Sequence, residues 1–389
     1  MLLCFTIFCF LIESWAQNST VAPGGMRQLK VALMMPVNMS DASVESNIGF
    51  YRSAGAVTIA LERIQLENLL PNTNFTFVWY FDECVGSLGS GYTVEAAYVD
   101  KADVLIGPAC PTPVIYSGTV AAFYNFPIFI WGTIMPSDIN DGTRFPTLAS
   151  TSVTTLSITL TLMEFLIRFQ WNEFAFIYAI RRSDLIPKCS YLASDIDNAV
   201  TNEDNMTMTY KRNIANDSYE ILKEKLVGLK KLARIILVCF ESLSDRRTFM
   251  MAMSELGMIT DDYLVVFIET DRTGFFPSGG GMWVDRNVPP DGKDDIALKA
   301  FENAIILDLQ PYNLSFDTFN QEVIANIEKW PFYCVGCIDK SLNASSRAPN
   351  LADTFYLYAS SLNKTIAQYG ESAKNDGTTI SNMAKGEYN

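Results

Sequence analysis

A short apolar segment between two cysteines constrains the fold of this chain more than any other feature. Val104-Leu-Ile106 is typical of a buried parallel strand, and Gly107-Pro108 ends it. Pro111 then fits the first turn of a helix. Cys110 lies at this strand-to-helix junction and Cys84 lies one loop upstream. Because ligands of open α/β sheets bind outside the carboxyl ends of the strands, the segment predicts a cysteine-stapled sheet edge beside a binding site.

Strand-like and helix-like segments alternate along the chain in two series, which predicts an α/β fold. The first series has strands at 28–35, 74–81, 104–106 and 127–131 and helices at 50–64, 92–100 and 114–125. The second has strands at 174–179, 206–210, 233–239 and 263–268 and helices at 155–170, 191–200, 219–230 and 245–256. We expect two doubly wound parallel-sheet lobes joined by hinge crossovers.

The predicted boundary between the lobes falls near Ala149-Ser150. Late helices at 315–329 and 351–368 have no matching strands, so we expect them to return to the first lobe. The expected division is therefore 17–149 for the first lobe, completed by 310–389, and 150–309 for the second lobe.

Residues 1–16 have the features of a signal peptide: a short apolar core, then Ser14-Trp-Ala16 as a cleavage site. Removing them takes away Cys4 and Cys9. Six cysteines remain, an even number that favours three disulfides in a secreted chain, and the residues alone allow about 15 pairings. Eight Asn-x-Ser/Thr sequons predict a glycoprotein, at Asn18, Asn38, Asn74, Asn205, Asn216, Asn313, Asn343 and Asn363.

Composition argues against several functions. A net charge of −14, without a clustered basic stripe, does not fit nucleic-acid binding. The chain has no histidine, so it lacks the usual catalytic triads and the commonest zinc ligand. The glycine run 279–281 is better explained as a flexible loop than as a phosphate cradle. Cys334-Val-Gly-Cys337 is better explained as a local disulfide than as half a zinc site. We therefore expect no catalytic residue, metal or cofactor in this chain.

Candidate ligand-binding residues follow the predicted strand ends, where a cleft between lobes would lie. Within this set, backbone N–H groups of Ala109 and Cys110 precede a helix and could hold an anion. Trp131 and Tyr178 are equally typical of core residues at strand ends. The ligand-binding set is Asn38, Gly107, Ala109, Cys110, Trp131, Tyr178, Arg181 and Glu241, with Pro36, Gly132, Thr270 and Asp271 as further strand-end positions.

Several motifs in this order and spacing resemble the ligand-binding ectodomain of receptor guanylate cyclases, a natriuretic-peptide-receptor-like group, and most closely its invertebrate members. The resemblance covers Leu29 to about Lys385. Its motifs are Gly107-Pro-x-Cys110 with Cys84, Cys189 with Cys239, Gly280-Gly-Met-Trp283, Asp291-Gly-x-Asp294, Ala300-Phe301 and Asp353-x-x-Tyr356-x-Tyr358-Ala359.

The resemblance implies a type I periplasmic-binding-protein fold and the pairs Cys84–Cys110, Cys189–Cys239 and Cys334–Cys337. Vertebrate relatives hold a chloride near the first pair with an upstream serine, and the matching stretch 77–83 has none. The family also implies homo- or heterodimers that contact through the helices at 92–100 and 112–125. In the peptide receptors, the hormone binds between two such ectodomains rather than in the cleft.

The resemblance thus predicts a sensory region that binds an extracellular peptide or small molecule and controls cGMP synthesis by domains absent from this chain. A membrane anchor would come only from a further C-terminal segment, because the family continues where this sequence stops, at Gly386–Asn389. The sequence would then be a fragment, a truncated gene model or a soluble form. Two alternatives are a secreted protein that sequesters ligand and the ectodomain of another receptor class with this fold.

Overall fold

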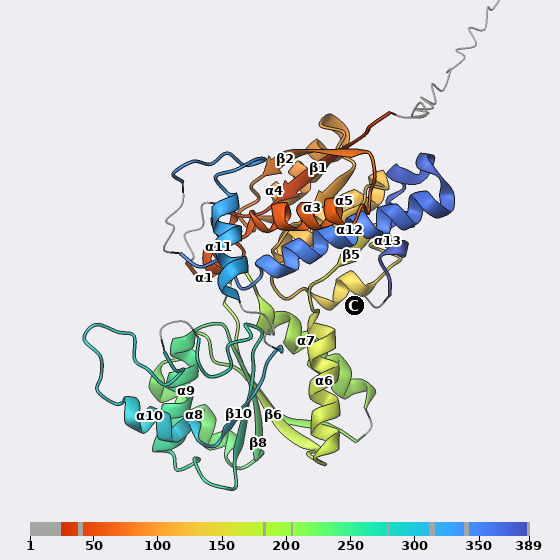
Figure 1. The fold of residues 1–389 in the computed structure, drawn as a ribbon. Coiled ribbons are helices and arrows are strands. Elements are labelled where there is room, and N and C mark those ends of the chain that lie inside the picture. The colour runs from red at the N-terminus through yellow and green to blue at the C-terminus, as the bar shows by residue number, and fades with distance from the viewer. Residues whose placement is uncertain are drawn as a thin grey trace, which may run out of the picture.

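The computed structural model describes residues 25–37, 42–181, 184–203, 205–277, 280–310, 316–337 and 342–386. Within them the chain forms two lobes, each built around a five-stranded parallel sheet (Figure 1). This confirms the expected α/β fold with two lobes. The predicted signal peptide and the sequons at Asn18, Asn38 and Asn313 lie outside the described residues.

The first sheet has the strand order β2-β1-β3-β4-β5, and every neighbouring pair is parallel. Its strands are β1 (Arg27–Met34), β2 (Thr73–Tyr80), β3 (Val104–Ile106), β4 (Ile128–Ile130) and β5 (Leu148–Ser150). The three residues of β3 and of β4 are fully buried, because helices cover both faces of this sheet.

Side chains of β1 alternate between the two helical layers of the first lobe. Leu29, Val31 and Leu33 face the layer that contains α1 (Ala42–Ile48), α2 (Phe50–Ser53), α3 (Ala56–Leu66), α11 (Phe316–Asn326) and α12 (Ala348–Tyr369). Ala32 and Met34 face the layer of α4 (Gly86–Val94), the π-helical turn η1 (Glu95–Val99) and α5 (Pro111–Tyr124). The period-2 pattern of a strand thus packs one sheet into two cores.

The second sheet has the order β10-β9-β8-β6-β7 and is also parallel throughout. Its strands are β6 (Glu173–Ala179), β7 (Thr207–Asn213), β8 (Ile235–Phe240), β9 (Leu264–Ile268) and β10 (Ala304–Leu307). Phe174 and Phe176 of β6 pack on α6 (Thr155–Arg168) and α7 (Lys188–Asn202). Ala175 and Ile177 pack on the other layer, which holds α8 (Tyr219–Leu229), α9 (Leu243–Glu255) and α10 (Asp294–Phe301).

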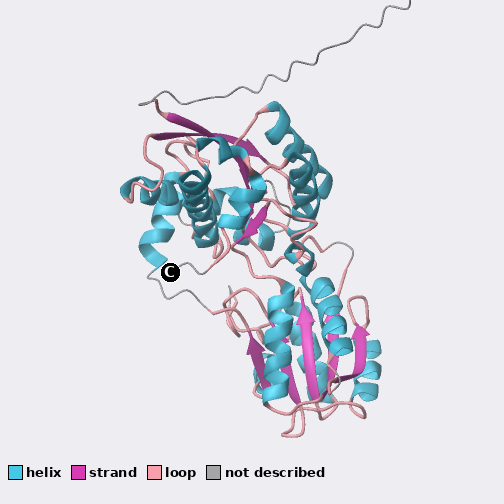
Figure 2. Ribbon diagram, turned by 90° about the vertical axis from the view of Figure 1, so that its right-hand side faces the viewer, coloured by secondary structure: helices cyan, strands magenta, loops and turns pink. Residues whose placement is uncertain are grey.

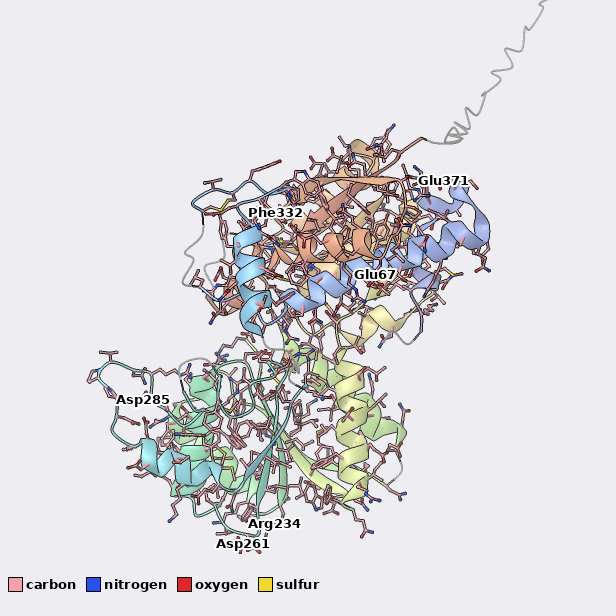
Figure 3. All side chains as sticks on the ribbon, in the orientation of Figure 1. Glu67, Arg234, Asp261, Asp285, Phe332 and Glu371 are labelled. Carbon is pink, nitrogen blue, oxygen red and sulfur yellow. A yellow bond between two sulfur atoms is a disulfide. The ribbon has the colours of Figure 1, made fainter. Side chains whose placement is uncertain are left out.

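The two lobes meet at a narrow waist (Figure 2). Residues 151–154 cross from β5 to α6, and the chain returns after β10 to α11 on the first lobe. α13 (Gly377–Met383) ends the described chain beside β5, with the 3₁₀ turns η2 (Ser137–Asn140) and η3 (Glu371–Asn375) nearby. Arg234 and Asp261, just before β8 and β9, lie at the end of the second lobe farthest from the first (Figure 3). The carboxyl ends of these strands therefore face the first lobe.

The structure differs from the sequence expectations in several places, and the helices α1, α10 and α13 were not predicted. The expected helix 50–64 is divided into α2 and α3 around Gly55, where an added Cβ would lie 1.9 Å from the Val323 carbonyl oxygen, so α11 packs directly on this backbone. The helix expected at 92–100 begins earlier and ends in a π-helical turn. β5 and β10, which form one edge of the first and of the second sheet, were not predicted.

Candidate functional site

A buried cluster of charged side chains lies at the carboxyl edge of the second sheet. Glu269 follows β9 directly, and Arg246 lies in the first turn of α9. The Arg246 guanidinium donates two hydrogen bonds of 2.6 Å to the Glu269 carboxylate, and the Lys188 ammonium lies 3.4 Å from it. Burial alone would lower the pKa of Lys188, but the surrounding carboxylates of Glu269, Glu241 and Asp271 outweigh it and raise that pKa. The cluster fixes the starts of two helices against the ends of the strands.

Glu241 ties the start of α7 to the end of β8. Its carboxylate accepts a 2.9 Å hydrogen bond from the backbone N–H of Cys189, and the Cys189–Cys239 disulfide joins the same two elements with Cα atoms 5.5 Å apart. Burial raises the pKa of Glu241, opposed by Lys188 and by the Cys189 N–H. Because the Glu241 carboxylate already accepts a hydrogen bond from a backbone N–H at the start of α7, it would compete with an external anion for that helix end.

The corresponding edge of the first lobe is built from tightly packed backbone. Gly107 has φ 106°, and an added Cβ would lie 2.1 Å from the Met34 carbonyl oxygen. Gly132 also has φ 106°, and its Cβ would lie 2.5 Å from the Ala109 carbonyl oxygen. The Cys84–Cys110 pair has Cα atoms 5.3 Å apart. The two glycines thus allow the backbone segments at this edge to pack closely on one another.

Asp82 is an unusual carboxylate beneath this edge. Its side chain is fully buried, and neither oxygen has a side-chain partner within the part of the chain that the structure describes. Burial raises the pKa of Asp82 to about 7, although the backbone N–H of Cys84 partly offsets this. The residue therefore titrates close to neutral pH, next to the disulfide that holds the strand-to-helix junction.

The predicted ligand-binding residues divide between the two edges. Arg181 and Glu241 lie close enough on the second lobe to interact, and Arg181 also forms a 2.8 Å ion pair with Asp245. Ala109, Cys110 and Trp131 are fully buried on the first lobe, so their side chains serve packing here. Tyr178 is half-buried and stacks on Phe176 at 5.2 Å. Asn38 lies outside the described residues.

Contacts across the waist involve residues that the sequence analysis did not single out. Arg347, just before α12, donates to the carbonyl oxygen of Thr270 and lies 3.6 Å from the Asp271 carboxylate. The Ser137 hydroxyl of η2 donates a 2.7 Å hydrogen bond to Asp195 of α7. Positions after strand ends pointed to Thr270 and Asp271, but no local pattern marks Arg347, because its partner is 77 residues away.

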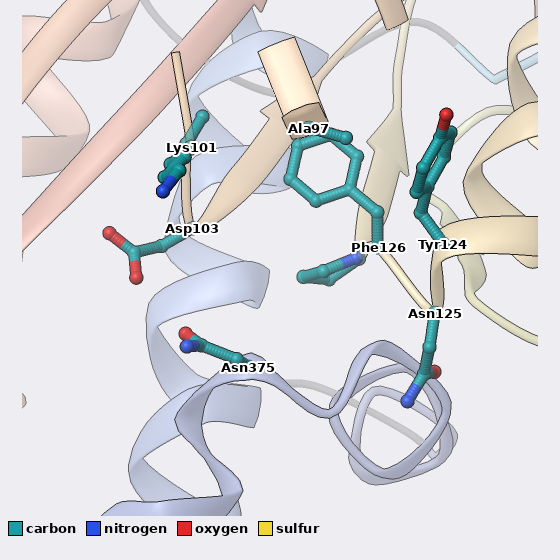
Figure 4. A pocket seen from close by; sticks show the side chains of 9 residues that line it. Ala97, Lys101, Asp103, Tyr124, Asn125, Phe126 and Asn375 are labelled. Atoms are coloured by element: carbon teal, nitrogen blue, oxygen red, sulfur yellow. The ribbon is translucent and has the colours of Figure 1, made fainter. Parts of the chain in front are cut away.

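Two cavities lie apart from the charged cluster. One of about 210 Å³ opens at the amino ends of β3 and β4, and Figure 4 shows Asp103, Phe126 and Asn375 around it. The other, of about 670 Å³, lies between β5, the crossover at 151–154 and α13, and includes Leu148, Ser152 and Lys385 in its wall. The smaller cavity is below the usual size of drug-like ligand sites, and the larger is within it.

The described sequon asparagines are mostly exposed. Asn74, Asn205, Asn216 and Asn343 lie at the surface. Asn363 is half-buried on α12, and the hydroxyl of its sequon threonine, Thr365, is buried and donates to the Ser361 carbonyl oxygen. The first four therefore remain open to modification, whereas the fifth is held within a packed helix.

Two further kinds of feature are absent from the described residues. No cluster of Cys, Asp or Glu in that part of the chain has the arrangement of a metal site. Of the helices described, none combines the length and apolar character needed to cross a membrane. The third disulfide joins Cys334 to Cys337, with Cα atoms 5.6 Å apart.

Comparison with known proteins agrees with this architecture. Residues 52–388 match the family model described as the receptor family ligand binding region. Receptor-type guanylate cyclase gcy-20 of Caenorhabditis elegans is 32% identical over 386 residues, which cover 94% of this chain and 34% of the relative. Receptor-type guanylate cyclases gcy-13 and gcy-14 of the same organism are 30% and 32% identical, over 86% and 88% of this chain and 33% and 32% of their own lengths.

This chain thus spans about a third of the length of these curated relatives. The family match begins within α2, so it includes the second lobe and the part of the first lobe that follows β1 and α1. Together with the two parallel sheets, the match shows that this chain belongs to the receptor family of ligand-binding regions.

Proposed function

We propose that this chain is the extracellular sensory region of a receptor guanylate cyclase. Its ligand, a peptide or small molecule, would change the relation between lobes or between paired ectodomains. That change would regulate cGMP synthesis by domains outside these residues. The observation that carries the proposal is that most of this chain matches a region of several receptor-type guanylate cyclases. That region is about a third of each relative, and the other two thirds have no counterpart in these residues.

The architecture supports a hinge mechanism. Two separate parallel sheets face each other with the carboxyl ends of their strands, and few segments join them. A ligand that contacts both edges favours one lobe arrangement by its difference in affinity. We propose lobe boundaries near 149–150 and 309–310, where the chain passes between the sheets, and Arg181, Glu241 and the backbone at 107–110 as the facing edges.

Dimerisation is proposed through the exposed face of α4, η1 and α5, which pack side by side. Large apolar side chains protrude from it, including Tyr98 at 70% exposure and Phe123 at 83%. Contiguous exposed apolar side chains commonly mark interaction surfaces. The described sequons with exposed asparagines lie on other elements, so glycans there would leave this face open. A homodimer would pair it with itself around a two-fold axis.

The cellular location follows from the proposed function. We propose that residues 1–16 direct the chain into the secretory pathway and that the lobes lie on the extracellular side of the plasma membrane. Three disulfides and several exposed sequons suit that compartment.

A chimeric receptor tests the proposal. The chain is fused to the membrane-spanning and intracellular parts of a receptor-type guanylate cyclase, and basal cGMP is measured in transfected cells. Phe123→Asp should change cGMP output because it disrupts the proposed dimer face, whereas Phe276→Asp, at an exposed site on the second lobe, should not. Equal output from both variants at equal surface expression would contradict coupling through this ectodomain.

A further inference from the structure

Arg347 connects the first lobe to the second from a buried position. It precedes α12 on the first lobe, and its side chain is only 6% exposed. Its Nη2 donates to the Thr270 carbonyl oxygen at the end of the second sheet and lies 3.6 Å from Asp271 Oδ1. A hydrogen bond from a charged donor is stronger than a neutral one, and burial protects it from water. This contact must break if the two edges separate here.

The first-lobe end of the contact is firmly held. The backbone N–H of Ser345 donates to the Arg52 carbonyl oxygen at 2.8 Å, and its hydroxyl donates to the Asn47 carbonyl oxygen. The same hydroxyl accepts a 2.9 Å hydrogen bond from the backbone N–H of Arg347. The turn before α12 is therefore fastened to α1 and α2, so Arg347 moves with the first lobe.

The second-lobe end is equally fixed. Thr270 and Asp271 directly follow Glu269, which Arg246 clamps with two hydrogen bonds of 2.6 Å. Lys188, at the start of α7, approaches the same carboxylate. Thr270 therefore moves with β9 and with the helices α7 and α9. The contact of Arg347 with Thr270 therefore links the first lobe to the whole second lobe rather than to a flexible loop.

Besides the Ser137–Asp195 hydrogen bond, a further interlobe contact is apolar. Leu185 and Ile186, from the segment before α7, pack against the first-lobe core cluster that includes Cys84, Cys110 and Trp131. Both side chains are half-buried. Separation of the lobes at this place would return their apolar surface to water, which opposes opening.

We propose that these two contacts form a built-in latch that holds the cleft closed before any ligand binds. The inference deepens the proposed function, because it concerns the resting state of the same cleft. The latch consists of Arg347 on the Thr270 carbonyl and of Leu185 with Ile186 on the first-lobe cluster. The resting form that ligand meets is then closed. The strength of the latch sets the fraction of molecules that are open.

Spin-label distance measurements on the expressed, disulfide-intact chain test the latch. Labels are introduced as non-canonical side chains at the exposed positions Glu62 on α3 and Asp262 before β9, so that no cysteine is added. The unliganded chain should give one narrow distance distribution, with a long mean because Asp262 follows Asp261 at the far end of the second lobe. Arg347→Met should add a longer-distance population, with the open fraction raised on the order of tenfold, since a charged hydrogen bond is lost.

Arg144→Met is the matched control, because the Arg144 guanidinium pairs with Asp138 inside the first lobe at 3.1 Å. It should leave the distribution unchanged. If Arg347→Met fails to fold, Leu185→Ser, at a half-buried site, should produce the same longer population. A folded Arg347→Met or Leu185→Ser variant with the wild-type distribution would overturn the latch. This readout needs no cyclase domain, so its failure is distinct from failure of the proposed function.

Discussion

Arg246 holds Glu269 through two parallel hydrogen bonds of 2.6 Å, and both side chains are about 4% exposed. The pair joins the first turn of α9 to the end of β9. Removing one partner of such a buried, bidentate pair is strongly destabilising, because the remaining charge is then buried without that partner and without water. It is therefore the electrostatic contact on which the second lobe most depends.

Replacing one partner of this pair tests that dependence. Arg246→Met should lower the free energy of unfolding by about 3–5 kcal/mol, the usual cost of a stranded buried charge. Urea unfolding followed by circular dichroism measures the loss. The double change Arg246→Met with Glu269→Leu should recover only part of it, because it removes both members of the bidentate pair but takes from buried Lys188 its 3.4 Å partner.

The control is the exposed Arg63–Glu67 pair at 2.8 Å, whose side chains are 53% and 40% exposed. Arg63→Met should cost less than about 1 kcal/mol, because water screens such pairs. Similar losses for Arg246→Met and Arg63→Met would mean that the buried pair contributes no more than a surface one.

Asp82 predicts a pH dependence of stability with a definite sign. Its pKa is raised from about 3.9 in an unfolded chain to about 7 in the folded lobe. The folded state thus holds this proton more tightly, so its stabilising contribution is complete below about pH 4 and lost as pH rises through about 7. Asp82→Asn keeps a neutral side chain at every pH and should remove that part of the decline.

Melting temperatures at pH 5 and pH 8 measure the effect. The free energy of unfolding of Asp82→Asn, relative to that of the parent chain, should increase between these pH values. The increase should be up to roughly 1.4 kcal/mol per pH unit. Asp261→Asn, at an exposed position, is the control and should follow the parent curve. Parallel curves for Asp82→Asn and the parent would show that Asp82 does not titrate between the two states.

Much of the fold could be predicted because its signals are local. The strand at 104–106 was predicted with the bounds that the structure gives β3, and the helix at 155–170 differs from α6 by two residues at its end. Buried parallel strands are continuous apolar runs, and amphipathic helices repeat at 3.6 residues. Both patterns are visible without knowledge of the fold.

The charged site was harder to predict because its contacts join distant segments. Glu241 and Arg181 were identified from their places after strands, but Lys188, Arg246 and Arg347 look like ordinary surface residues in the sequence. Their partners are 81, 23 and 77 residues away. Only the folded chain brings them together, since no helical or strand period relates positions so far apart.

The disulfides should differ in their contribution to stability. In the chain-entropy model a bridge stabilises by restricting the unfolded chain, and more so for longer loops. Cys189–Cys239 closes a separation of 50 residues and Cys334–Cys337 one of 3. Replacing the first pair by alanine should cost roughly 4 kcal/mol and the second roughly 1.5 kcal/mol. Thermal unfolding of the two double variants measures the order, and a larger loss from the 334–337 pair would contradict it.

The exposed face of α4, η1 and α5 predicts a change in oligomeric state. Phe123 and Tyr116 of α5 are 83% and 54% exposed, and Tyr98 of η1 is 70% exposed. A charge placed there would have to be buried without a partner in a dimer, which opposes association. Phe123→Asp should therefore sediment as a monomer at concentrations where the parent chain forms dimers. Phe276→Asp, which alters a 67% exposed ring on the second lobe, should leave sedimentation unchanged. If the parent chain stays monomeric at every concentration, this face is not a dimer contact, because no second copy covers its apolar surface.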